Sequence, residues 1–241
     1  MKMTKLALAV TAAACTLLGL APAATAAPAA PPAGDHEVTP MIIGGGYASN
    51  APWAARLFSN GRETCSASII APQYVLTARH CVSGGGISFR IGSLDQHSGG
   101  VVANAVQIYR HTSDLAIARL DRSVNATYAP LGTTSDVAVG QNVQIYGWGA
   151  TSRCGSEINC QSRYLKVATV RVQSTTASDA YGGLAIRAYR VDGIAAGGDS
   201  GGPMMANGRQ VGVASTSDRQ SVTNYTNVTR YRSWISSIAG V

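Results

Sequence analysis

From residue 42 onward, the chain consists of short apolar or alternating segments, and no helical repeat separates them before the final stretch. Examples are ISFRIGSL (87–94), DLAIARL (114–120), NVQIYGWG (142–149) and RQVGVAST (209–216). Clusters of Gly, Asn, Ser and Asp lie between such segments, which is typical of half-buried strands joined by turns. Many short strands without intervening helices favour a sandwich or a barrel over βαβ units. The pattern predicts an all-β domain.

Two stretches depart from this pattern. The final stretch, TNVTRYRSWISSIAGV (226–241), has apolar side chains at three- to four-residue spacing, which predicts a C-terminal helix. These side chains are Val228, Tyr231, Trp234, Ile235 and Ile238. The polar stretch NATYAPLGTTSDVAVG (125–140) is the best candidate for a linker between two halves of the domain.

The first 26 residues have the layout of a secretory signal peptide. A basic start, MKMTK, precedes a mostly alanine apolar segment that ends at an A-x-A cleavage site, Ala24-Thr25-Ala26. This segment is shorter and less apolar than a membrane-spanning helix requires, and no second apolar span follows. Residues 27–41 are rich in Ala and Pro and predict an extended pro-segment. We therefore expect a secreted protein that does not contact membranes after signal cleavage.

Cysteine usage supports export. Cys15 lies inside the signal segment, which leaves Cys65, Cys81, Cys154 and Cys160. An even number in an exported chain favours two disulfides. Metal binding is the alternative, but there is no C-x-x-C pair and no histidine cluster near the cysteines. Four cysteines allow three pairings, of which the local one, Cys65–Cys81 with Cys154–Cys160, fits the short separations.

The formal net charge of +7 comes from scattered arginines and not from a basic run. No zinc-finger or RNA-binding signature accompanies it. The charge therefore indicates solubility and a mild attraction to acidic partners, and we expect no nucleic-acid partner.

The segment AAGGDSGGPMM (195–205) raises the question of whether Ser200 lies in a plain turn, in a helix-opening elbow or at the site of a nucleophile. GDSGG matches the G-x-S-x-G elbow of α/β-hydrolases, in which the histidine follows the serine. Every histidine of this chain precedes Ser200, so that order is excluded. The subtilisin order needs an aspartate before the histidine, and the only one before His80 is Asp35 of the pro-segment.

His97 and His111 could each follow Asp95, but neither lies in a catalytic sequence context. The order His, Asp, Ser remains. His80 is the candidate base, because it follows an apolar strand and is anchored by Cys81.

These segments resemble the chymotrypsin/trypsin-like secreted serine proteases, particularly the bacterial, actinomycete-type members. The resemblance covers residues 42–241 and is carried by IIGG, CSASIIAPQYVLTARHC, SDLAIARL, GWG, GGDSGGP and YRSWI in that order. It implies two six-stranded antiparallel β-barrels with a C-terminal α-helix and an active site between the barrels. The first barrel would span about 42–124, the linker about 125–140, and the second barrel with the helix about 141–241.

The resemblance also assigns roles within a serine endopeptidase acting on protein or peptide substrates. Ser200 would be the nucleophile, His80 the general base and Asp114 the buried acid that orients the imidazole. The backbone N–H groups of Gly198 and Ser200 would form the oxyanion hole. Ser215 would support the acid and pair with the substrate backbone.

The primary specificity pocket should have Ile194 at its base, six residues before Ser200, and Ser217 and Thr223 as its walls. Thr216 replaces a tryptophan that commonly lines the substrate channel. A buried cation would find no counter-charge at Ile194, so trypsin-like cleavage after Arg or Lys is not expected. We interpret Asp192 as an acidic residue of a loop and not as a displaced base of the specificity pocket. These residues predict a broad preference for small or medium apolar side chains.

The resemblance further implies activation by cleavage before Ile42, whose new ammonium group would pair with Asp199. Gly44 and Gly45 would supply the hinge for this movement. Met41 precedes the cut, which argues against an activator that requires Arg or Lys.

Other features depart from the family pattern. Arg79 stands where a small residue is usual, so its side chain must leave the cleft or lie along it. Ala196 removes one cysteine of the disulfide that usually crosses the specificity pocket. The Cys154–Cys160 loop has only a structural role, and a short 92–101 loop predicts no calcium. We expect no cofactor or metal and a monomer; the alternative function is a catalytically silent, protease-like binding protein.

Overall fold

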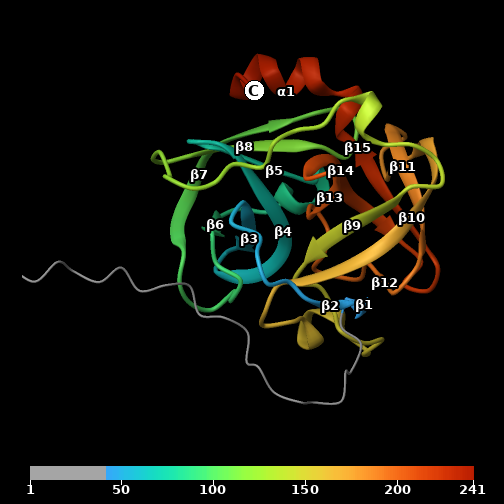
Figure 1. Ribbon diagram of the computed structural model, residues 1–241. Helices are drawn as coiled ribbons and strands as arrows, with labels where there is room; N and C mark the ends of the chain where they lie inside the picture. The colour runs from blue at the N-terminus through green and yellow to red at the C-terminus, as the bar shows by residue number, and fades with distance from the viewer. Residues whose placement is uncertain (1–41) are drawn as a thin grey trace, which may run out of the picture.

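The computed structural model describes residues 42–241, and the signal peptide and pro-segment predicted over 1–41 lie outside them. A closed antiparallel barrel forms the first half (Figure 1). Its strands, in order around the barrel, are β3 (Ala54–Ser59), β4 (Arg62–Ala71), β5 (Tyr74–Thr77), β8 (Ala116–Leu120), β7 (Val101–Arg110) and β6 (Ile87–Ile91). Asn60 and Gly61, both at positive φ, form the two-residue turn between β3 and β4, as the twist of a tight hairpin favours.

The second half is a barrel of the same size. It contains β9 (Asn142–Gly147), β10 (Lys166–Ser178), β11 (Leu184–Arg190), β13 (Pro203–Ala206), β14 (Arg209–Ser217) and β15 (Val222–Asn227). Pairing of β10 with β11 closes it. The prediction of two six-stranded antiparallel barrels is therefore confirmed. Residues 125–140, the expected linker, contain only an isolated bridge at Leu131 and the short 3-10 helix η2 (Thr134–Asp136).

The first few residues of the described chain correct one boundary. Residues 42–47 were assigned to the first barrel, but β1 (Ile43–Gly44) pairs with β12 (Gly193–Ile194), and β2 (Gly46–Tyr47) pairs with β10. This segment therefore belongs to the second barrel. The backbone N–H and C=O groups of this short segment need hydrogen-bond partners, and the neighbouring edges of β10 and β12 supply them.

The C-terminal helix α1 is shorter than expected. It spans Arg232–Ala239, since Val222–Asn227 forms β15 and Val228–Arg230 forms the 3-10 helix η4. The helix follows the second barrel in sequence but packs on the first, where Ile235 is fully buried (Figure 1). Within residues 42–241, no helix is long and apolar enough to cross a membrane.

Candidate active site

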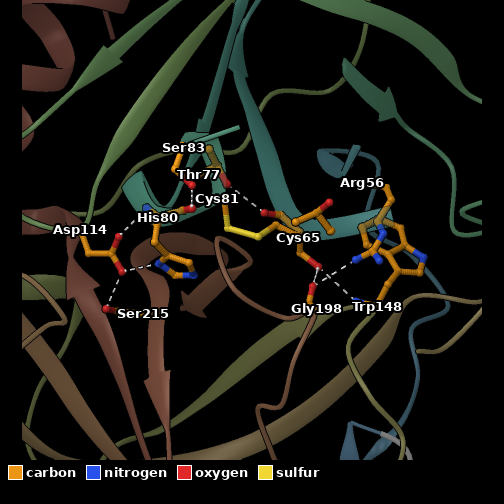
Figure 2. Close-up of a disulfide and its surroundings, with 12 residues drawn as sticks. Arg56, Cys65, Thr77, His80, Cys81, Ser83, Asp114, Trp148, Gly198 and Ser215 are labelled. Carbon is orange, nitrogen blue, oxygen red and sulfur yellow. Dashed lines mark hydrogen bonds and ion pairs between the residues drawn. A yellow bond between two sulfur atoms is a disulfide. The ribbon is translucent and has the colours of Figure 1, made fainter. Parts of the chain in front are cut away.

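The His80 segment is held in place by a disulfide and a short helix. His80 lies in η1 (Arg79–Val82), directly after β5, and Cys81 is bonded to Cys65 of β4 (Figure 2). Thr77 donates to the Ser66 carbonyl at 3.0 Å and ties the end of β5 to β4. The predicted disulfides Cys65–Cys81 and Cys154–Cys160 are both formed.

Asp114 is fully buried and faces His80. One carboxylate oxygen lies 2.8 Å from His80 Nδ1 and accepts from Ser215 Oγ at 2.7 Å, and the other accepts from the His80 backbone N–H at 3.0 Å (Figure 2). Burial works against ionisation, but the hydrogen bonds from His80 and Ser215 outweigh it and hold the pKa of Asp114 below its ordinary value. An ionised Asp114 requires a proton on Nδ1, which leaves Nε2 as the basic nitrogen.

His80 and Ser200 line the same cavity, which has a volume of about 350 Å³. The described hydrogen bonds do not join the two side chains, and such contacts are often long in proteases without bound substrate. Since Asp114 engages Nδ1, the free Nε2 of His80 is the nitrogen available to a nucleophile in the cavity. The structure thus brings together the three residues that the sequence assigned to the triad.

Gly198 has a conformation that suits an anion-binding loop. Its φ is +100°, and a Cβ would lie 2.6 Å from the Gln161 side chain, so a larger residue would be both strained and crowded. The Gly197 carbonyl accepts from Ala150 N at 2.8 Å, and planarity of the peptide turns the Gly198 N–H the opposite way. Within residues 42–241, neither this N–H nor that of Ser200 has a hydrogen-bond partner.

Behind Gly198 lies Arg56, which sequence analysis missed. Its guanidinium is buried, donates to the Gly198 carbonyl at 3.1 Å and bonds the Gln161 side chain (Figure 2). Ser66 Oγ donates to the same carbonyl at 2.9 Å. Burial lowers the pKa of Arg56 to about 10, partly offset by Asp199. A lone arginine inside a strand carries no motif that could have revealed this role.

Asp179 is a second missed residue. Its buried carboxylate accepts from the backbone N–H of Asp114 at 3.0 Å and from Thr226 Oγ1 at 3.0 Å, so it orients the segment that carries Asp114. It also accepts from the N–H groups of Tyr181 and Gly183 in the turn that follows. The sequence DAYGG does show a turn-forming aspartate, but nothing in it points to Asp114.

The two residues of the expected activation pair are both buried. Ile42 has no exposed surface and a φ of +48°, which is unusual for a β-branched residue. The Asp199 carboxylate accepts from Gly149 N at 2.7 Å and Ala196 N at 2.9 Å. It has no ion-pair partner in the described part of the chain, and burial raises its pKa to about 6. Asp199 is thus oriented inward while Ile42 is still part of an intact chain.

The specificity pocket differs from expectation at its base. Ser217 and Thr223, paired across β14 and β15, both line the cavity, as does Thr216. Ile194 does not: it is fully buried in β12 opposite Ile43, and Ala195 lines the wall instead. Neighbouring side chains of an extended backbone point to opposite faces, which turns Ile194 away from the cavity.

Two other side chains near the cleft have clear positions. Asp192 is exposed, accepts from Thr169 N at 2.7 Å and does not line the cavity. Arg79 leaves the cleft, donating to the carbonyls of His111 and Thr112 at 3.2 and 3.0 Å with its guanidinium 4.4 Å from the Tyr181 ring centre. Neither side chain fills the pocket.

Two antiparallel barrels with an Asp–His pair facing a serine at their junction define a two-barrel serine hydrolase. The family model described as Trypsin matches residues 42–235. Trypsin alpha of Drosophila melanogaster is 34% identical over 231 residues, covering 82% of this chain and 87% of the relative. Trypsin alpha-4 of Lucilia cuprina is 33% identical over 214 residues, covering 79% of this chain and 84% of the relative. The chain belongs to the trypsin family and is a serine endopeptidase.

Solved structures agree with this fold. Neuropsin, a serine protease expressed in the limbic system of mouse brain, has a TM-score of 0.68 at 25% identity and covers 80% of this chain and 98% of that one. An inactivated protease paralogue of the scabies mite has a TM-score of 0.73 at 23% identity, covering 82% of this chain and 97% of that one. The second likeness concerns the fold alone.

Proposed function

We propose that this chain hydrolyses peptide bonds through a His80–Asp114–Ser200 triad and an acyl-enzyme intermediate. The observation that carries the proposal is the buried Asp114 carboxylate 2.8 Å from His80 Nδ1, because it fixes the tautomer that a general base needs. The Cys65–Cys81 disulfide and the Ser215 hydroxyl hold this pair from either side.

In the proposed mechanism, Ser200 Oγ attacks the substrate carbonyl carbon while His80 Nε2 accepts the hydroxyl proton. The carbonyl oxygen becomes an anion, to which the N–H groups of Gly198 and Ser200 donate; one such donor contributes about 3 kcal/mol to the transition state. The C–N bond then breaks as His80 passes its proton to the leaving amine. Water, deprotonated by His80, attacks the acyl ester, and Ser200 leaves with the proton. Asp114 stays ionised throughout.

The wider proposal is a secreted, monomeric enzyme that acts on protein or peptide substrates without nucleic acid, membrane, cofactor or metal. Secretion rests on the signal peptide over 1–26. Activation by cleavage before Ile42 rests on the buried Asp199 carboxylate, which has no ion-pair partner among residues 42–241. The bacterial, actinomycete-type subtype rests on the sequence motifs alone, and the curated relatives above are insect trypsins.

A catalytically silent binding protein is the rival proposal, and an inactivated paralogue with this fold shows that it needs a test. The processed protein should react covalently with a fluorophosphonate probe at Ser200, and the Ser200→Ala variant should not react. Labelling is measured by gel fluorescence and by mass spectrometry of the modified peptide. A folded, correctly processed protein that is never labelled would refute the enzymatic proposal.

We further propose a broad preference for small or medium apolar residues before the scissile bond. Ser217 and Thr223 narrow the pocket, and Ala195 and Ala196 line its wall without charge. Peptides that differ only at this residue should rank Ala, Val and Leu above Arg and Lys in kcat/KM. One methylene changes selectivity by only about 1–3 kcal/mol, so the differences among apolar residues should be modest. A tenfold advantage for Arg or Lys would overturn the preference.

A further inference from the structure

An ion pair between Glu157 and Arg219 lies at the wall of the substrate cavity. Arg219 Nε donates to Glu157 Oε1 at 2.7 Å, and Arg219 is one of the residues lining the cavity. The other carboxylate oxygen of Glu157 accepts from the backbone N–H of Gly197, also at 2.7 Å. Arg219 Nη1 donates to the Ser217 carbonyl at 2.8 Å. We call these four residues the pocket clasp.

The pocket clasp joins three segments that are far apart in sequence. Glu157 belongs to the 3-10 helix η3 (Glu157–Cys160), Gly197 to the loop that leads to Ser200, and Arg219 to the turn between β14 and β15. Gly197, Ser217 and Arg219 all line the cavity. Ala196 excludes a disulfide at its own position, and the clasp supplies a side-chain link between these walls.

A disulfide, a hydrogen bond to Arg219 and a close approach at Gly197 hold the clasp in this geometry. The Cys154–Cys160 disulfide closes the loop that carries Glu157. Arg153 donates to the Arg219 carbonyl at 3.0 Å, and Arg219 holds a positive φ of 60°. A Cβ at Gly197 would lie 2.2 Å from Glu157 Oε2, so only glycine permits this approach.

The clasp also determines the charge of the cavity. Apart from the titratable His80, Arg219 is the one cationic side chain among the residues that line it. The hydrogen bond from Arg219 outweighs partial burial and lowers the pKa of Glu157, so the carboxylate is ionised at neutral pH. The negative charge of Glu157 offsets the positive charge of the Arg219 guanidinium. A pocket of Ala, Ser and Thr side chains therefore stays close to neutral.

We propose that Glu157 is a specificity-determining residue that masks the charge of Arg219 toward the substrate. Removing the carboxylate exposes an unpaired guanidinium at the pocket wall, which attracts an acidic side chain placed before the scissile bond. This inference rests on the proposed peptidase function and deepens it. Glu157 acts on the substrate only through Arg219, so we regard it as a positioning residue.

The test compares pairs of peptides that carry Glu or Gln before the scissile bond and are otherwise identical. In the Glu157→Gln variant, the amide oxygen can still accept from the Gly197 N–H, whereas the amide NH2 group cannot accept from Arg219. The substitution therefore removes both the negative charge and the hydrogen bond to Arg219, and keeps the link to Gly197. The kcat/KM ratio of the Glu peptide to the Gln peptide should rise about five- to tenfold over the unmodified enzyme. The rise should shrink in 1 M NaCl, because Arg219 is partly exposed and salt screens its attraction for the carboxylate of the substrate.

Three further variants separate charge from structure. Glu157→Gln combined with Arg219→Gln should show no rise, and Glu157→Asp, which retains the charge, should keep the original ratio. Asp136→Asn removes a remote surface ion pair with Arg209 and should change nothing. All variants are first titrated with the fluorophosphonate probe. If the unmodified enzyme is not labelled, the proposed function fails; if Glu157→Gln is labelled without a change in ratio, or the double variant keeps the rise, the clasp proposal is overturned.

Discussion

Replacing His80 by alanine should lower kcat by about four to six orders of magnitude, because Ser200 then loses the base that takes up its proton. Folding should be nearly unaffected. The His80 side chain is one-third exposed, and Asp114 retains its hydrogen bond from Ser215. The measurement is kcat per active site with a peptide substrate, together with a thermal melt.

His97→Ala is the matched control. His97 is half exposed and its only ion-pair partner in the described structure is Glu63, at 3.6 Å. This variant should retain full activity. Comparable activity in His80→Ala would mean that another group is the general base.

Activation should depend on Asp199, with a smaller loss than that expected for His80→Ala. N-terminal sequencing of the active enzyme should begin at Ile42, and the processed Asp199→Asn variant should lose about 10²- to 10³-fold in kcat/KM. Removing one partner of a buried ion pair costs about 3–5 kcal/mol, and here the loss would disorder the loop that carries Gly198 and Ser200. Asp192→Asn, at an exposed acid near the same loop, is the control and should remain active. Active protein that still carries HEVTPM would contradict the mechanism.

The pH dependence of stability provides a second readout of activation. Burial raises the pKa of Asp199 to about 6 in the uncleaved chain, from an ordinary value of 3.8. A carboxyl whose pKa rises on folding loses stability as it ionises, so the free energy of unfolding of the precursor should fall between about pH 4 and 6. Under the proposed activation, the ammonium group freed at Ile42 would stabilise the ionised form of Asp199. Urea titrations of the cleaved enzyme should therefore lack this fall.

The sequence was sufficient to predict the fold and to propose the triad, because the signals for both are local. Alternating segments and turn glycines specify strands, and the segments around His80, Asp114 and Ser200 each carry several informative neighbours. The order of the three along the chain then excluded two other hydrolase arrangements. The prediction that Ile194 forms the base of the pocket was wrong by one residue, since Ala195 lines the cavity instead. The face that an extended segment turns toward the cavity depends on its pairing, here with β1, and the sequence does not show this pairing.

The residues that sequence analysis missed are single charges whose partners are distant in sequence. Arg56 contacts Gly198, 142 positions away, and Asp179 contacts Asp114, 65 positions away. Glu157 and Arg219 are 62 positions apart. In the sequence each looks like an ordinary surface charge, since its burial and its partner are decided only by the tertiary fold. Such pairings cannot be read from periodicity or local motifs.

The contacts of Asp114 have a thermodynamic consequence. This residue of the first barrel is held by three side chains of the second: Ser215 on its carboxylate, Asp179 on its N–H and Thr226 on its carbonyl. A ligand that spans the cleft touches both barrels, so its binding is linked to their association. At a hundred times its Kd, such a ligand adds about 2.7 kcal/mol to the stability of the joined state. By the same reciprocity, a substitution that weakens the barrel interface far from Ser200 weakens every inhibitor that binds across it.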